Sequence, residues 1–134
     1  MTTTIKQLIE KNKKAFDNNY LIESINLSYI LINKALKQII KDELNQEVID
    51  NKIKTSNLIN HIKKVFEVNP QLKTKLSKKV IKDIDLFIDL YKSISKELKY
   101  QYPEKKISET AQLGINCIVI LNTSLLKIKN NKVD

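Results

Sequence analysis

The sequence predicts an all-α fold: an up-and-down bundle of four main helices with a short helix at the N-terminus. Apolar residues recur at intervals of three and four along nearly the whole chain, which is the period of an α-helix with one buried face. There is one glycine in 134 residues, too few for the turns of a β-sandwich or the phosphate loops of nucleotide-binding folds. The two prolines, Pro70 and Pro103, lie where apolar periods begin or end.

Helix boundaries are predicted from caps and breaks between the apolar periods. Asn69 before Pro70 predicts a helix start, because proline at the first helical position loses no hydrogen bond. Residues 55–57, Thr-Ser-Asn, predict another cap. The expected elements are a short helix over 5–16 and main helices over 20–44, 56–66, 70–102 and from 103 or 108 to 128. All 134 residues are predicted to form one domain, with a frayed tail from about residue 130.

The third main helix has an unusually wide apolar arc. Two stripes of apolar residues lie side by side on this helix, so a single neighbouring helix cannot cover both. We therefore expect this helix to lie at the centre of the bundle, or against the bundle and a second chain together. The first stripe is Ile81, Ile84, Ile88, Tyr91, Ser95, Leu98 and Tyr102, and the second is Leu76, Val80, Phe87, Leu90 and Ile94.

The last helix carries the only glycine of the chain on its predicted packed face. We expect Gly114 to let another backbone approach closely. The longest unbroken apolar run, residues 117–121, is also in this helix and is far too short to span a bilayer. The predicted packed face is Ile107, Ala111, Gly114, Ile118, Leu121, Leu125 and Ile128.

The charge is strongly basic and comes from lysine alone. The chain has 24 lysines, no arginine, a net charge of +9 and a pI near 9.5. Lysine attracts nucleic acid as a point charge but lacks the guanidinium fork that reads phosphate and guanine, and AT-rich coding also favours it. The first ten residues lack an apolar signal-peptide core, so we expect a cytoplasmic protein that does not enter a membrane.

The reactive side chains that stand alone predict neither a cofactor nor a metal site. His61 is expected at the surface, and Cys117 is expected to pack as a small apolar residue. Asp85 and Asp89 share a helix face, but lysines three residues away on either side predict ion pairs rather than a metal. One Cys with one His also excludes a zinc finger.

Residues 91–103, YKSISKELKYQYP, resemble the signature region of the HEPN superfamily of helical bundles. In that family an Arg, usually followed by Asn, precedes a His by a few residues, and a Tyr often follows the His. Ser95 stands at the Arg position and Lys96 at the Asn position. Tyr100 stands at the His position, and Tyr102 matches the additional Tyr.

The resemblance implies a helical bundle related to metal-independent RNases, in which His and Arg of two chains meet at a dimer interface. Ser95 cannot stabilise phosphate charge as Arg does, and a tyrosine phenol is a poor base at neutral pH. We therefore expect a catalytically inactive binding or regulatory module. We expect a homodimer formed through Ile81, Ile88, Tyr91, Ser95 and Leu98.

The resemblance also implies a biological setting and partners. These are a toxin–antitoxin or phage-defence system, a nucleotidyltransferase-type protein partner, RNA as a ligand, and Tyr102 as an acceptor of nucleotide modification. Two alternatives stay open. One is a divergent RNase that uses Tyr100, Lys96 and His61. The other is an unrelated helical module that binds another protein.

Overall fold

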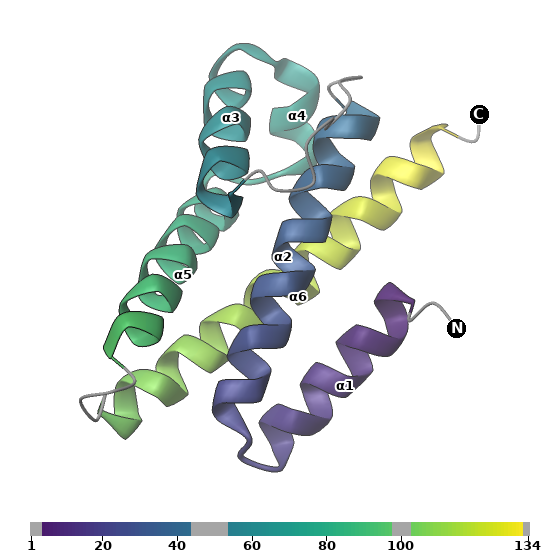
Figure 1. The fold of residues 1–134 in the computed structure, drawn as a ribbon. Helices are drawn as coiled ribbons and strands as arrows, with labels where there is room; N and C mark the ends of the chain where they lie inside the picture. Colours follow the sequence, from purple (N-terminus) through teal and green to yellow (C-terminus); the bar gives the residue numbers. More distant parts are fainter. Residues whose placement is uncertain (1–3, 44–53, 98–102, 133–134) are drawn as a thin grey trace.

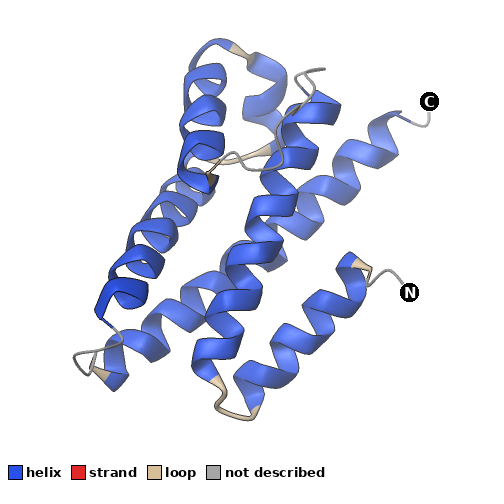
Figure 2. Ribbon diagram, viewed as in Figure 1, coloured by secondary structure: helices blue, strands red, loops and turns tan. Residues whose placement is uncertain are grey.

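The computed structural model describes residues 4–43, 54–97 and 103–132, with the side chains of 42, 43, 97 and 124–132 left out. These residues are helical apart from short connections, and no strand occurs among them (Figure 2), so the predicted all-α class is confirmed. They form six helices rather than the five expected. The helices are α1 (Ile5–Asp17), α2 (Leu21–Glu43), α3 (Thr55–Val68), α4 (Pro70–Lys75), α5 (Lys78–Glu97) and α6 (Glu104–Lys132).

The additional helix arises because the predicted third main helix is broken after its first turns. Asn69 caps α4 as expected, and its side chain accepts a hydrogen bond from the Leu72 backbone N–H at 3.1 Å. Leu76 then adopts an extended backbone, and the Ser77 hydroxyl accepts from the Val80 N–H at 3.1 Å to begin α5. Leu76 and Val80 are both buried at a helical spacing of four, so the apolar period continues across the break and conceals it.

Other helix ends follow local chemistry. Thr4 and Gln7 form a reciprocal capping box at the start of α1. Asn19, between α1 and α2, has φ 64°, a left-handed conformation that asparagine tolerates better than most residues. Thr55 does not cap α3 as expected, because it is already the first helical residue and Lys54 holds the cap position; its hydroxyl accepts from Asn33 of α2 at 2.7 Å. At the other end of the chain, α6 stays helical to Lys132, beyond the predicted start of the tail.

Helices α2 and α6 form the centre of the bundle. Helix α2 contacts α1, α3, α5 and α6, and α6 runs obliquely behind it (Figure 1). Helix α5 packs against α2, α3 and α6, so three helices of the same chain cover its wide apolar arc. Ile84 and Phe87, one from each predicted stripe, are accordingly almost fully buried.

A buried polar cluster joins α1 and α2, and one of its members faces Gly114 of α6. The Asn12 side-chain amide donates to the Ser28 hydroxyl at 2.8 Å, and the Ser24 hydroxyl donates to the Asn12 side-chain oxygen at 2.6 Å. All three side chains are completely buried. A Cβ added at Gly114 of α6 would lie 2.8 Å from the Ser28 Cβ and 2.8 Å from the Phe87 ring. Gly114 therefore does allow a close approach, but side chains rather than another backbone occupy the space.

We predict that Gly114→Ala destabilises the fold. Alanine favours a helix over glycine by about 1 kcal/mol, whereas overpacking a fixed contact costs about 1–3 kcal/mol. The Ser28 Cβ is attached to a buried helix backbone and cannot move aside cheaply, so we expect a net loss of about 1 kcal/mol in the free energy of unfolding. Urea denaturation measures it. Exposed Gln112→Ala in the same helix is the control and should change stability by less than about 0.5 kcal/mol. A stabilised Gly114→Ala variant would contradict the packing described.

Candidate functional site

Two of the four motif positions lie within the described structure. Ser95 and Lys96 are exposed in the last turn of α5, which ends at Glu97. Tyr100 and Tyr102 lie outside the described residues. The structure therefore places a hydroxyl and an ammonium group together at the end of α5, both in contact with solvent.

Tyr91, at the start of the motif, packs against the bundle. Its half-buried ring stacks on that of Tyr29 in α2, with centroids 3.9 Å apart and planes 11° apart. The Phe87 ring lies 6.5 Å away at a tilt of 36°. This arrangement attaches α5 to α2, so packing is the role the geometry supports for Tyr91.

Two residues of the predicted dimer interface are buried within a single chain. Ile81 is 5% exposed and Ile88 is 1% exposed within a single chain, because α2, α3 and α6 already cover this side of α5. Neither side chain is available to a second copy. Ser95 is exposed, Tyr91 is half-buried, and Leu98 lies outside the described residues.

The remaining candidate residues do not assemble into a catalytic or metal site. His61 is half-buried in α3. Asp85 forms an ion pair with Lys63 of α3, which replaces the expected pairing along α5, and both side chains are more than a third exposed. Such a partly exposed pair contributes at most about 1 kcal/mol. No group of three or more potential metal ligands occurs among the described residues.

Cys117 of α6 packs in the core, as expected. It is 1% exposed, and burial, with a smaller contribution from the Asp83 carboxylate, raises the pKa of its thiol to about 12. A thiol that stays protonated at neutral pH is a poor nucleophile. The geometry therefore supports a packing role for Cys117.

A groove between α4 and α6 brings distant segments of the chain together on the described surface. Its volume is about 380 Å³. Val119 and Ile120 of α6 line one side and are 56% and 42% exposed. Its remaining lining residues are Lys73, Thr74, Lys75, Leu76, Ser77 and Thr123.

Among the described residues, lysines supply all the ionisable groups that line this groove. The Lys73 ammonium also lies 5.8 Å from the centroid of the Phe66 ring of α3, an attraction between a cation and an aromatic face. The two lysines, the three hydroxyl residues and the exposed apolar pair form a surface suited to an anionic ligand with an apolar part. We name this surface, as defined by these lining residues, the α4–α6 groove.

Sequence reasoning missed the α4–α6 groove because its two sides are more than 40 residues apart. One signal was present in the run of residues 117–121. Five consecutive apolar residues in a helix spread around its circumference, so the core cannot take all of them. Cys117, Ile118 and Leu121 point into the bundle, and Val119 and Ile120 are left exposed.

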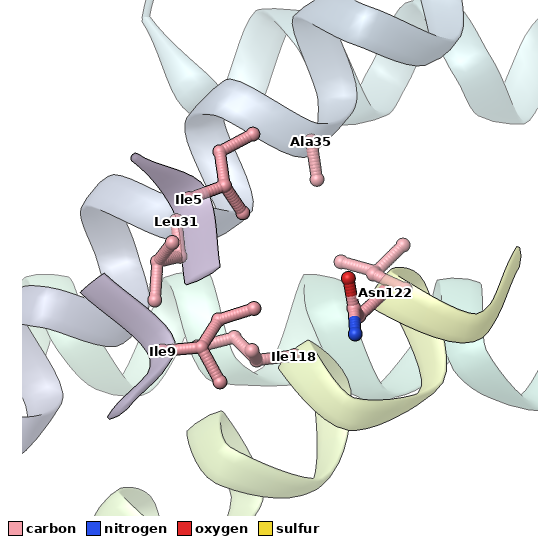
Figure 3. A pocket seen from close by; sticks show the side chains of 7 residues that line it. Ile5, Ile9, Leu31, Ala35, Ile118 and Asn122 are labelled. Atoms are coloured by element: carbon pink, nitrogen blue, oxygen red, sulfur yellow. The ribbon is translucent and has the colours of Figure 1, made fainter. Parts of the chain in front are cut away.

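A second, smaller space lies between α1, α2 and α6. It has a volume of about 20 Å³, and Figure 3 shows the side chains of these three helices that line it. Ile5 and Ile9 come from α1, and Ile118 from α6. Its lining is almost entirely apolar, so it offers a ligand little room and few polar partners.

This chain was compared with known proteins. No protein-family model, curated protein sequence or solved structure matches it. Among the described helices, none is both long enough and apolar enough to cross a membrane.

We predict that the Cys117 thiol resists alkylation in the folded protein. Raising its pKa from 9.0 to about 12 lowers the thiolate fraction about a thousandfold at pH 8. Iodoacetamide should therefore react at least about a hundredfold more slowly with the folded chain than with the chain unfolded in urea. Equal rates in the two states would show that Cys117 is exposed.

The same pKa shift predicts a pH dependence of stability. The unfolded thiol loses its proton from about pH 9.0, whereas the folded thiol keeps it until about pH 12. Between these two pH values the unfolded state therefore binds fewer protons than the folded state. The free energy of unfolding consequently falls as the pH rises through this range. Cys117→Ala should show a smaller loss of stability from pH 9 to 11 than the wild type.

Proposed function

We propose that this chain is a non-catalytic helical binding module. The observation that carries the proposal is the α4–α6 groove, where exposed Val119 and Ile120 lie beside lysines and no carboxylate of the described residues lines the surface. Exposed apolar side chains with a charged rim are typical of contact surfaces between macromolecules.

The HEPN-like character of the module is part of the same proposal. It rests on the sequence resemblance of residues 91–103, and it includes the toxin–antitoxin or phage-defence setting and a nucleotidyltransferase-type partner. The exposure of Ser95 and Lys96 is compatible with a contact surface at the end of α5. A serine hydroxyl and a lysine do not reproduce the Arg–His pair of an RNase, so binding is favoured over cleavage.

RNA remains a proposed ligand on the strength of the net charge. Twenty-four lysines and a net charge of +9 attract phosphate without regard to sequence. Such attraction weakens steeply with salt, which distinguishes it from recognition in a defined groove.

Incubation of mixed cellular RNA with the purified protein in EDTA tests the non-catalytic proposal. We expect no cleavage above buffer for the wild type or for Tyr100→Phe, because neither supplies a base suited to neutral pH. Cleavage that co-elutes with the folded protein and disappears in Tyr100→Phe would contradict the proposal and identify a metal-independent RNase.

Light scattering tests the proposed homodimer. We expect twice the chain mass of 15.6 kDa for the wild type. Ser95→Glu should shift the mass toward that of a single chain, because a two-fold interface would bring both carboxylates together. Ser93→Glu is the matched control, since Ser93 is also exposed in α5 but points to another side of the helix. A wild-type mass of one chain, or equal effects of the two variants, would rule out this interface.

A further inference from the structure

We propose that the α4–α6 groove binds an acidic, apolar-faced segment of a protein partner. The inference rests on the proposed binding function and names the class of partner for that surface. An apolar side chain of the partner would lie against Val119 and Ile120, and a carboxylate of the partner would face Lys73.

Two neighbouring side chains of α6 give the groove an exposed apolar surface. Val119 and Ile120 are about half exposed, although Cys117, Ile118 and Leu121 around them are buried. Leu76 also lines the groove and is itself 3% exposed, so it belongs to the core as well as to this surface. The volume of about 380 Å³ lies within the range of about 300–1,000 Å³ that is usual for ligand pockets.

Positive charge is the second feature of the groove. Among the described residues, Lys73 and Lys75 line it, and no Asp or Glu of these residues does. Two further lysines, Lys78 and Lys79, are exposed in the first turn of the adjoining helix α5. A partner with carboxylates beside its apolar side chains complements this pattern.

Two other occupants fit the surface less well. Nucleic acid is held by phosphate contacts and base stacking, and the described residues that line the groove include neither arginine nor an aromatic side chain. Its apolar wall would lie against phosphate and sugar. A second copy of this chain, docked by the same surface, would bring like-charged lysines together.

A synthetic peptide titration tests the inference directly. The probe is a fluorescein-labelled helical peptide of roughly 16 residues, with leucines at positions i, i+3, i+4 and i+7 and glutamates between them. Fluorescence anisotropy gives its affinity, and methyl and amide NMR spectra locate its site. We expect saturable shifts at Leu76, Val119 and Ile120. Peptides with serine replacing leucine, or with lysine replacing glutamate, should bind at least tenfold more weakly.

Matched variants separate the groove from general surface effects. Ile120→Ser and Lys73→Glu should each weaken peptide binding at least tenfold. Ile30→Ser and Lys34→Glu are the controls, since Ile30 is 45% exposed on α2, close to the exposure of Ile120, and Lys34 is exposed one turn further on. The controls should bind as the wild type does.

Three outcomes would overturn the inference: no saturable shift at the groove, equal losses in test and control variants, or displacement of the peptide's shifts by a short oligouridylate that binds there more tightly. Binding of the oligouridylate elsewhere, with no peptide binding at the groove, would overturn the partner class but leave the proposed binding function standing. RNA cleavage by the wild type would overturn the function independently of the peptide result.

Discussion

The close crossing of α6 over α2 at Gly114 is the constraint on which the rest of the structure depends. A side chain larger than hydrogen would meet both Ser28 and Phe87 at 2.8 Å. Asn12 of α1 bridges Ser24 and Ser28 of α2, so α1 is attached to α2 at a residue that also faces Gly114. These polar side chains are fully buried and hydrogen-bonded to one another. A satisfied network of this kind favours one arrangement of α1 and α2 over alternatives of similar apolar burial.

This crossing also determines where α6 meets the other end of the bundle. Helix α6 runs obliquely behind α2 toward the end of the bundle at which α4 lies (Figure 1). Helix α4 contacts α6, and the break at Leu76 and Ser77 brings the start of α5 to the same surface. The groove is therefore a consequence of two local features: a glycine that permits a close crossing and a serine cap that interrupts a long apolar period.

The sequence was sufficient to predict the helical class, most helix positions, the packed role of Gly114 and the burial of Cys117, because these follow from local periodicity and size. It did not reveal the break at Ser77, since burial of residues on both sides preserves the helical period. Asn12 carried no sign of its burial, because its partners lie on another helix. The predicted place of Ile88 in a dimer interface does not fit its burial within one chain, for a similar reason: apolar spacing shows that a face is buried but not by which chain.

A direct test of the central claim uses the fact that Gly114 is the only glycine in the chain. Its two α-protons can therefore be identified unambiguously in an NMR spectrum of the folded protein. If α6 crosses α2 closely at Gly114, we expect strong nuclear Overhauser effects from these protons to the β-protons of Ser28 and to the ring of Phe87. Effects confined to neighbouring residues of α6 would contradict the crossing, and with it the position of the groove.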